Sequence, residues 1–548
     1  MAINVNDISF GYPGTETLFF DVSFKVETGQ HAALIGDNAV GKSTLMKVLV
    51  GDLEPEEGTV RVDGAVRRMA QSIGQRDDAR NVREFLGAAS GPHIARADAA
   101  LAEATARNDA EHDAASGVVL AEAVSSWAAF GGYEIEARWD DCTMRVLGQP
   151  LTQAQNRPIT ELSGGERKRL ALEVLFSSDA EVLLLDEPDN FLDIPGKRWL
   201  EQRIRSTNKT LLVISHDREL LSNSIGKLVT IEPSGSSWVH GGSFRGYHAA
   251  RDARNERLGS AVERWKQEER RLFRYYKLLK QRAGASEAMA SRAAAAESRW
   301  ERFVASGPPP APPSEQRVNM KLTGADSGRK VVMCDALELV GLTYPFSVDV
   351  YFGDRVAVIG PNGSGKSHFV RLLDGEPVEI EGRYALGARV EAGLFVQTND
   401  PAEFTGRTPA EAIARYVGTE EKVMRALARY ELDGVAKSPF EWLSGGQQAR
   451  LQVLALELGG ANLLLLDEPT DNLDLVSAEA LQDALEDFTG TVVAVTHDRW
   501  FMRNFDRFLV FDDDGEVAEA MDIETALGSV SGDETFEASP GSLRLLSA

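Results

Sequence analysis

Short apolar runs, each followed by a turn and an amphipathic stretch, recur along most of the chain. Strands are predicted at residues 32–36 and 356–360, where the sequences AALIG and VAVIG are short and apolar. In both places a glycine-rich turn follows, and then an apolar-periodic helix (TLMKVLVG or HFVRLLDG). The runs EVLLLDEP and NLLLLDEP are strongly apolar, which is typical of strands covered on both faces of a parallel sheet. This alternation predicts α/β domains with mainly parallel sheets.

The same series of elements occurs twice. GDNAVGKST begins at position 36 and GPNGSGKSH at position 360, while LSGGE begins at 162 and LSGGQ at 443. LLLDEP ends at 188 and again at 469, and the next predicted strand in each half ends in SHD or THD. From the leucine of LSGG to that histidine there are 54 positions in both halves. The chain is therefore an internal duplication.

Two segments interrupt the repeat. Between the glycine-rich turn and LSGG the first half has about 43 more residues than the second, and we expect a helical insertion at about 88–130, which is rich in alanine. A helical hairpin is predicted between the halves, with its tip at RAGASEAMA and its end at GPPPAPP. The expected organisation is a first domain at 1–241, a basic hairpin linker at 242–330, a second domain at 331–517 and a weakly ordered tail at 518–548.

Composition narrows the class of protein. A chain of 548 residues is long enough for two domains, and its net charge of −25 argues against a surface coated for nucleic acid throughout. No apolar run approaches the ~20 residues that cross a bilayer, and the start, MAINVNDISFGYPG, lacks the features of a signal peptide. Cys142 and Cys334 form no CxxC motif, and we interpret them as packing residues. These observations predict a cytoplasmic globular protein.

The pattern GxxxxGK[ST], after a strand and at the start of a helix, predicts a phosphate-binding loop. Backbone N–H groups of such a turn point at phosphate oxygens, and the helix adds its positive N-terminal end. We expect the lysines to reach the β- and γ-phosphates of ATP and the serines after them to ligate Mg²⁺. The predicted loop residues are Gly36, Asp37, Asn38, Ala39, Val40, Gly41, Lys42, Ser43 and Thr44 in the first half, and Gly360, Pro361, Asn362, Gly363, Ser364, Gly365, Lys366, Ser367 and His368 in the second.

Adjacent carboxylates end both LLLDEP runs. The aspartate of each pair suits holding Mg²⁺ through water, and the glutamate suits polarising the water that attacks the γ-phosphate. The histidine that ends the next strand is predicted to contact the γ-phosphate and the attacking water. The predicted catalytic residues are Glu187, His216, Glu468 and His497, and the predicted metal ligands besides Ser43 and Ser367 are Asp186 and Asp467.

These motifs resemble those of the ATP-binding cassette (ABC) family, over about 1–240 and 331–515, and LSGG is the most specific of them. The resemblance implies a fold of two tandem ABC ATPase (P-loop NTPase) domains joined by the helical-hairpin linker. In that family the domains pack head to tail, and each ATP lies between the phosphate loop of one domain and LSGG of the other. The first phosphate loop would then face Ser444, Gly445 and Gly446, and the second would face Ser163, Gly164 and Gly165.

Further positions match the family or depart from it. Gln71 and Gln397 match its glutamine loop, and Tyr12 matches the aromatic residue that stacks on adenine. Ala39 stands where the phosphate loop usually has a second glycine. His368 replaces the threonine after GKS, which removes a hydroxyl near the α-phosphate. Both sites keep their carboxylates and histidines, so we expect two ATPase sites that differ in their phosphate-loop residues.

The linker differs in charge from the rest of the chain. Residues 251–302 contain fourteen Lys or Arg against eight acids, with aromatic residues among the cations. Basic side chains neutralise phosphates, and aromatic rings stack on bases. An exposed hairpin whose charges only solvate it, and whose aromatics pack helix on helix, fits the composition equally well. The candidate RNA contacts are Arg274, Lys277, Lys280, Arg282 and Arg292.

The whole architecture resembles the ABC-F family, in which one chain has two ABC domains, an insertion in the first and a helical connector between them. The resemblance implies a monomer that uses ATP and Mg²⁺ and pairs its two domains within one chain. It also implies binding at the tRNA exit site of the ribosome, with the connector against the P-site tRNA and rRNA and the insertion near the L1 stalk. ATP would close the domains into a ribosome-binding form, and hydrolysis would release the protein.

Several functions stay open at this point. Within ABC-F, some members are translation factors and others protect the ribosome from antibiotics. A composition rich in arginine and alanine suggests a high-GC genome and leans towards protection. The other class is the ATPase subunit of a transporter with separate membrane subunits, which leaves the basic hairpin without a role. A third, ATP-driven work on DNA, lacks the long coiled coils or zinc-binding cysteines of ABC proteins that do it.

Overall fold

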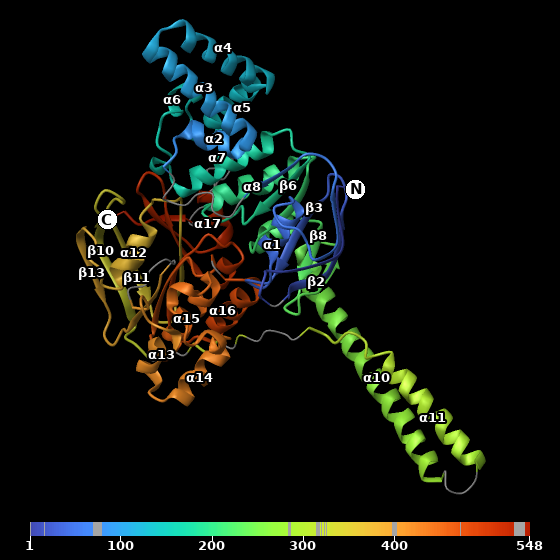
Figure 1. The fold of residues 1–548 in the computed structure, drawn as a ribbon. Coiled ribbons are helices and arrows are strands. Elements are labelled where there is room, and N and C mark those ends of the chain that lie inside the picture. The colour runs from blue at the N-terminus through green and yellow to red at the C-terminus, as the bar shows by residue number, and fades with distance from the viewer. Residues whose placement is uncertain are drawn as a thin grey trace.

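Two α/β bodies lie side by side, and a long pair of helices projects from the first of them (Figure 1). The computed structural model describes residues 2–15, 17–69, 79–282, 287–313, 318, 320–322, 324, 326–396, 403–471, 473–530 and 543–547. Both bodies contain a mainly parallel sheet with helices packed on it, so the predicted α/β class is confirmed.

The first domain is built on a six-stranded sheet of order β5-β6-β7-β3-β8-β9, in which only β9 runs antiparallel to its neighbour. The strands of the first domain as a whole are β1 (Ile3–Gly11), β2 (Thr17–Val26), β3 (His31–Gly36), β4 (Glu57–Val62), β5 (Val66–Met69), β6 (Val182–Asp186), β7 (Thr210–Ile214), β8 (Lys227–Ile231) and β9 (Ser237–His240). Of these, β2, β1 and β4 form a separate three-stranded sheet. Its helices next to the sheet are α1 (Lys42–Leu49), α7 (Gly164–Ser177), α8 (Ile194–Ser206) and α9 (Arg218–Ser224). β6 and β7 are buried at every position because the sheet is covered on both faces.

A group of helices fills the long insertion of the first domain. They are α2 (Val82–Ser90), α3 (Pro92–Glu111), α4 (Ala114–Ala129), α5 (Gly132–Leu147) and α6 (Leu151–Ala154). α3 and α4 form the hairpin farthest from the sheet (Figure 1). Trp127 and Trp139, each 1% exposed, pack with their ring centroids 6.0 Å apart. Arg83 of α2 forms an ion pair with Asp98 of α3, with its Nη2 2.7 Å from Oδ1, and so joins α2 to the hairpin α3–α4.

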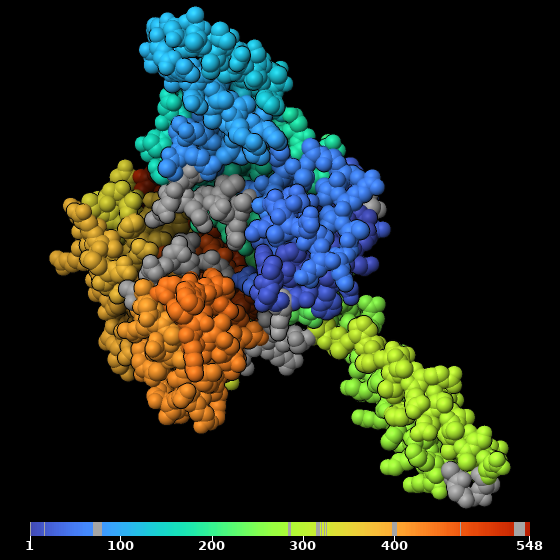
Figure 2. Space-filling view, in the orientation of Figure 1, coloured from blue at the N-terminus to red at the C-terminus, as the bar shows by residue number. Residues whose placement is uncertain are grey.

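The linker is a two-helix hairpin of α10 (Tyr247–Arg282) and α11 (Glu287–Ala305), entered through the 3₁₀ turn η2 (Phe244–Gly246). It extends away from both bodies (Figure 2). Tyr276 and Trp300 stack between the helices at 6.0 Å, and Trp265 stacks on Phe303 at 5.4 Å. Tyr275 is 55% exposed. The aromatics of the linker therefore serve mainly helix packing, while Phe273 and Tyr275 are exposed at the surface.

The second domain repeats the first. Its strands are β10 (Lys330–Leu339), β11 (Phe346–Tyr351), β12 (Arg355–Ile359), β13 (Ile380–Leu386), β14 (Ala392–Phe395), β15 (Leu463–Asp467), β16 (Thr491–Val495), β17 (Arg507–Phe511), β18 (Val517–Ala520) and β19 (Leu543–Leu545). Its helices are α12 (Lys366–Leu373), α13 (Pro409–Val417), α14 (Glu420–Arg429), α15 (Gly445–Gly459), α16 (Leu475–Asp487) and α17 (Ile523–Val530). The main sheet has the order β14-β15-β16-β12-β17-β18-β19, so β12, which precedes the phosphate loop, lies in the middle.

The prediction of a weakly ordered tail at 518–548 is wrong for its described part. β19 pairs antiparallel with β18, with Leu543 opposite Ala520. α17 buries Ala526, and the backbone oxygen of Leu527 accepts a hydrogen bond from Arg198 of the first domain at 3.4 Å. A terminal segment is ordered when such pairing and docking tie it down. The hydrogen bond from Arg198 to Leu527 joins positions 329 residues apart in the chain.

In the part of the chain that the structure describes, no single helix is long and apolar enough to cross a membrane. The bent pair α4 and α5, at 71° to each other, passes that test only when the two helices are taken together.

Candidate functional site

The first phosphate loop connects β3, in the middle of its sheet, to α1. Gly41, with φ of 101°, forms the N-cap of α1. Lys42 is buried, and its Nζ donates to the backbone oxygens of Gly36 at 2.7 Å and Asp37 at 2.8 Å. Burial lowers the pKa of Lys42, while the acids around it oppose that shift. The ammonium group thus lies inside the loop, where phosphate oxygens of a nucleotide would replace the carbonyls as its partners.

The second phosphate loop has the same construction between β12 and α12. Lys366 is buried, and its Nζ donates to the backbone oxygens of Gly360 at 2.9 Å and Pro361 at 2.5 Å. The loops differ at one backbone position, because Ala39 has a φ of 65° where Gly363 has 91°. Only glycine adopts this left-handed conformation without steric strain. The first loop therefore has a strained residue at the position where the second has a relaxed one.

Each loop serine hydrogen-bonds to the aspartate that ends a strand two places away in the sheet. Ser367 Oγ donates to Oδ1 of Asp467 at 2.9 Å, and Ser43 pairs with Asp186. Burial raises the pKa of both aspartates. Oδ1 of Asp186 is buried without a hydrogen-bond partner. A hydroxyl beside a buried, unsatisfied carboxylate is the type of oxygen ligand set that Mg²⁺ takes, so the residues fit that ion.

The two glutamates have an unusual backbone conformation. Glu187 and Glu468 have φ of 48° and 47°, and their N–H groups donate to Ile214 and Val495 of the next strand, each at 2.9 Å. Because β6 and β15 pair in parallel with those strands, the carboxyl ends of both strands meet at one edge of the sheet. Strain of this kind occurs at functional sites when the surrounding structure enforces it. Both carboxylates lie near enough to the loop lysines to oppose the lowering of the lysine pKa values by burial.

The second glutamate also contacts the predicted catalytic histidine of its own domain. Oε2 of Glu468 accepts from the backbone N–H of His497 at 3.0 Å, and its Oε1 lies 3.5 Å from Nε2 of that ring. Burial raises the pKa of Glu468 well above its usual range, and Asp471 and Asp467 add to this shift. In the first domain Oε2 of Glu187 accepts instead from Asn190 Nδ2 at 2.8 Å. The two sites therefore hold their glutamates differently.

Burial favours the neutral imidazole form of both histidines. Burial, with Lys42 nearby, lowers the pKa of His216 to about 3, and burial lowers the pKa of His497 well below its usual range. Both ring nitrogens of His216 and Nδ1 of His497 are buried without a hydrogen-bond partner. A neutral imidazole with a free N–H is a suitable donor to a γ-phosphate oxygen or to a water molecule. The neutral form of both predicted histidines is therefore compatible with the role that the sequence predicts for them.

The LSGG segments form the N-termini of two helices. Ser163 caps α7, because its Oγ accepts from the N–H of Glu166 at 3.1 Å while Oε2 of Glu166 accepts from the N–H of Ser163 at 2.8 Å. Ser444 caps α15 in the same way with Gln447. Gly164 and Gly445 are the first residues of these helices. Their backbone N–H groups therefore lie at the positive N-terminal end of the helix, which favours phosphate.

Contacts between the domains place one LSGG segment beside the other domain's phosphate loop. A Cβ on Gly165 would lie only 3.4 Å from Nδ2 of Asn362, and that Nδ2 donates to the backbone oxygen of Phe191 at 3.1 Å. At the first loop, the N–H of Asn38 donates to Oδ2 of Asp474 of the second domain at 3.4 Å. The geometry brings Gly165 and the second loop together directly, and the first loop meets the second domain through Asp474.

Some predicted positions lie at the rim or outside the described residues. Gln71 and Gln397 fall outside the described residues. Tyr12 is 41% exposed, and its hydroxyl lies 3.2 Å from Oγ1 of Thr44 in the first loop, which leaves the ring at the rim of the site. His368 is exposed at the start of α12.

Sequence reasoning missed the residues that cross the domain interface. Asp474 and the arginines after SHD and THD make such contacts. The repeat could have indicated them, because Asp193 and Asp474 occupy equivalent positions in the two halves, as do Arg218 and Arg499. It also missed Lys168 of α7, whose Nζ is buried without a hydrogen-bond partner. Burial lowers the pKa of Lys168 to about 8.

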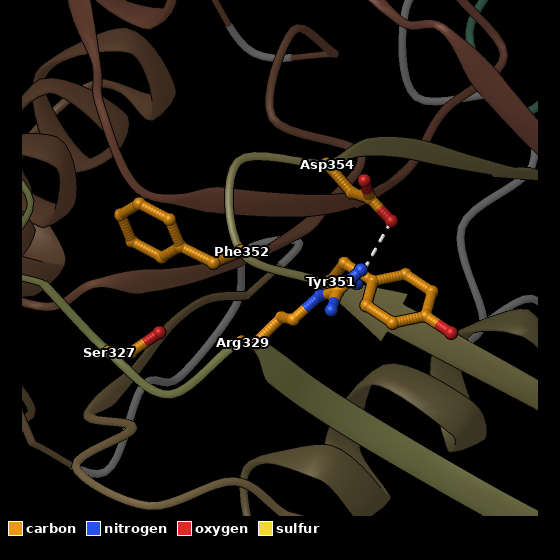
Figure 3. Close-up of a pocket in the computed structure, with 5 residues that line it drawn as sticks. All are labelled: Ser327, Arg329, Tyr351, Phe352 and Asp354. Carbon is orange, nitrogen blue, oxygen red and sulfur yellow. Dashed lines mark hydrogen bonds between the residues drawn. The ribbon is translucent and has the colours of Figure 1, made fainter.

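A separate hollow lies at the turn between β11 and β12, away from the phosphate loops. Figure 3 shows its lining, with Tyr351 donating its N–H to Oδ2 of Asp354 at 2.9 Å. The lining residues are Ser327, Arg329, Tyr351, Phe352 and Asp354. All five are outside the ATP motifs.

Two phosphate loops, each with paired carboxylates and a neutral histidine, define an ATP-hydrolysing P-loop protein with two sites. The family model described as ABC transporter matches residues 19–190 and 344–471. The chain is 45% identical to the "Antibiotic resistance protein" of Mycobacteroides abscessus, over 95% of this chain and 99% of that protein. It is 31% identical to the "Tylosin resistance ATP-binding protein TlrC" of Streptomyces fradiae, over 88% of this chain and 92% of that protein.

Among solved structures, the fold is similar to archaeal ribosome recycling factor aABCE1, solved in complex with ribosomal stalk protein aP1. The TM-score is 0.59 at 17% identity, over 99% of this chain and 95% of that chain, which is a likeness of fold alone. The chain belongs to the ATP-binding cassette family, within its ABC-F group of twin-domain ATPases. The predicted family and the predicted ATPase activity are thereby confirmed.

Proposed function

We propose that the two domains bind two ATP molecules between them, each with Mg²⁺, and that ATP-driven pairing lets the protein bind the ribosome. Lys42 and Lys366 would hold the β- and γ-phosphates, and Asp186 and Asp467 would hold Mg²⁺ with the loop serines. The metal would neutralise charge on the transferred phosphoryl group. The short approach of Gly165 to Asn362 supports the head-to-tail arrangement.

The glutamates and histidines would divide the work of hydrolysis between them. In this scheme Glu187 and Glu468 orient the attacking water, and the neutral histidines donate to the γ-phosphate. Hydrolysis would remove the phosphate that joins the two domains and so release the protein from the ribosome.

The projecting hairpin α10–α11 is the observation that favours a ribosomal role over a transporter subunit. Its candidate RNA contacts Arg274, Lys277, Arg282 and Arg292 are exposed, as is Lys280, whose Nζ lies 3.7 Å from Oε1 of Glu297. Cations on a surface that stands clear of both domains are free to neutralise RNA phosphates. We propose that this hairpin contacts the P-site tRNA and rRNA.

We further propose that the protein protects ribosomes from an antibiotic in the cytoplasm. The relative at 45% identity is named for antibiotic resistance, and TlrC is named for resistance to tylosin. In cell-free translation with tylosin, the protein is expected to restore synthesis. If the protein raises synthesis equally with and without tylosin, the result would support a general translation role instead.

Ribosome pelleting with the Glu187→Gln/Glu468→Gln variant tests the ribosomal role. The change removes the groups that position water and leaves both phosphate loops intact, so it is expected to trap ATP. The variant should pellet with ribosomes only when ATP is present. A matched variant with Lys42→Ala and Lys366→Ala in addition should stay in the supernatant. Fractionation with membranes and not with ribosomes would favour the transporter subunit.

The hairpin contacts have their own test in the same assay. Arg274→Glu/Lys277→Glu in the ATP-trapping variant should weaken pelleting and reduce its dependence on salt concentration, because each lost phosphate contact lowers the salt slope. Arg61→Glu, at a 77% exposed side chain on β4, is the control that should pellet normally.

A further inference from the structure

The segment after the first histidine crosses the domain interface. Nη2 of Arg218 lies 3.3 Å from Oδ2 of Asp498, and Nη1 donates to Oε1 of Gln482 on α16. Arg218 is 2% exposed. A guanidinium in such a position needs polar partners, because an unpaired buried charge is strongly destabilising. Both partners belong to the second domain, so this arginine is satisfied only when the two domains are together.

The segment after the second histidine crosses in the reverse direction. Nη2 of Arg499 binds Oε1 of Glu201 on α8 and lies 3.8 Å from Oδ1 of Asp217. Asp217 also lies 3.4 Å from Nζ of Lys197. Because Arg499 and Arg218 occupy the same position in the two repeats, the contacts are reciprocal. Each histidine segment is therefore anchored in the other domain by its arginine.

Trp500, next in the chain after Arg499, joins this interface to the linker. The guanidinium of Arg218 lies 5.5 Å from its ring centroid, and that of Arg503 lies 4.3 Å away. Phe244 of η2 meets the same ring edge-on, with centroids 6.3 Å apart and planes at 83°. The N–H of Trp500 donates to Oδ1 of Asp498 at 2.8 Å, which fixes the tryptophan to the segment after His497.

The first turn of α10 contacts both domains. Tyr247 is 3% exposed, stacks on Phe244 at 5.7 Å, and pairs its hydroxyl with Thr230 of β8 at 3.1 Å, so it belongs to the first domain. One residue further on, Nε2 of His248 lies 3.2 Å from Oε1 of Glu479 on α16 of the second domain. The root of the long hairpin is thus held from one side by the first domain and from the other by Trp500 and Glu479.

We propose that Trp500 is a positioning residue that couples the pairing of the two ATP-binding domains to the direction of the hairpin α10–α11. When the domains are paired, Phe244 is held against Trp500 and α10 has one direction. When they separate, α10 keeps only its contacts within the first domain, and the direction of the hairpin varies. This inference rests on the proposed ATP-driven pairing, and it adds how the ATP state reaches the distant tip of the hairpin.

The test measures two distances in the full-length Glu187→Gln/Glu468→Gln chain with ATP, using pairs of spin labels at introduced cysteines. Labels at Arg61 and Arg425, with side chains 77% and 75% exposed, report the pairing of the domains. Labels at Arg271, 66% exposed, and Arg425 report the direction of the hairpin. The native Cys142 and Cys334 are buried.

Trp500→Leu is expected to leave the interdomain distribution unchanged and to broaden the hairpin distribution at least twofold. Trp500→Phe keeps a ring against Phe244 and should restore the narrow distribution. Tyr133→Leu, at a 57% exposed aromatic residue of α5, is the matched control and should change neither distance.

A hairpin distribution that stays narrow in Trp500→Leu, or that broadens as much in Tyr133→Leu, would overturn the coupling. If the interdomain distance distribution of the parent chain is the same with and without ATP, both the coupling and ATP-driven pairing would be overturned. A parent chain that pairs on ATP but does not pellet with ribosomes would contradict the ribosomal role alone, and the label distances would still support the coupling.

Discussion

Ala39 has a backbone conformation that its counterpart Gly363 adopts without strain. The left-handed region costs an L-residue about 1–2 kcal/mol. A glycine removes this strain, but it also increases the conformational entropy of the unfolded chain, which offsets part of the stabilisation. We therefore expect Ala39→Gly to stabilise the first domain by up to about 1 kcal/mol, a rise of ~2–4 °C in its thermal midpoint by calorimetry. Gly363→Ala, at φ of 91°, should lower the midpoint of the second domain. Equal midpoints in all three proteins would contradict the assignment of strain.

Asp37 makes the stability of the paired form depend on pH. Burial, with Asp474 of the second domain beside it, raises the pKa of Asp37 to about 6 from 3.8. Because the folded form binds a proton more readily than the unfolded form, this carboxyl destabilises the protein progressively as pH rises from about 4 to 6. Asp37→Asn should therefore stabilise the protein at pH 7.5, by up to about 3 kcal/mol, and have little effect at pH 4. Thermal midpoints at the two pH values measure the difference, and an equal gain at both would be evidence against it.

The motif residues could be predicted one by one, whereas their partners across the interface could not. Lys42, Asp186 and their repeats stand at fixed spacings in both halves, and the structure places them at the carboxyl ends of parallel strands of one sheet, with one strand between them. The contact of Asn38 with Asp474 joins positions 436 residues apart. Sequence periodicity reports local structure, so such a contact follows only from the way in which the two domains dock.

The same limit applies to the helices and strands. The predicted phosphate-loop helices and apolar strands are short and strongly patterned, and the structure contains them. The tail was misjudged because β19 is only three residues long and is ordered by pairing with β18, while α17 docks against the first domain. The linker composition left two interpretations open. Rings of the linker pack between its helices and the candidate RNA-contact cations are exposed, which is compatible with either interpretation, so the RNA contacts stay a prediction.

Trp300 packs between the two helices of the hairpin. Its ring stacks on Tyr276, lies 5.2 Å from Phe273, and donates its Nε1–H to Oε1 of Glu269 at 3.0 Å. Trp300→Ala is expected to destabilise the hairpin by about 3–5 kcal/mol and to separate α11 from α10. Limited proteolysis should then cut the linker at least tenfold faster, while ATP turnover by the domains continues. Tyr275→Ala, at a 55% exposed ring, should leave the linker as resistant as in the parent.

The pairing of the whole molecule depends on charges that only the other domain satisfies. Arg499 is 7% exposed and binds Glu201, so Arg499→Glu would place two carboxylates together in a buried interface. Breaking a buried ion pair on one side costs about 3–5 kcal/mol. We therefore expect Arg499→Glu to prevent ATP-dependent pairing in the Glu187→Gln/Glu468→Gln chain, measured as loss of the short interdomain distance.

The reversed pair Glu201→Arg/Arg499→Glu should recover a large part of that pairing, because the two charges again meet across the interface. Arg107→Glu alters an exposed pair with Glu111 within the first domain, which water screens, and should leave pairing intact. Recovery in the double variant would show that Arg499 acts through its contact with Glu201. If the double variant stays as open as Arg499→Glu, the second histidine segment pairs the domains by other contacts, and Asp217, 3.8 Å from the guanidinium, is the next residue to reverse.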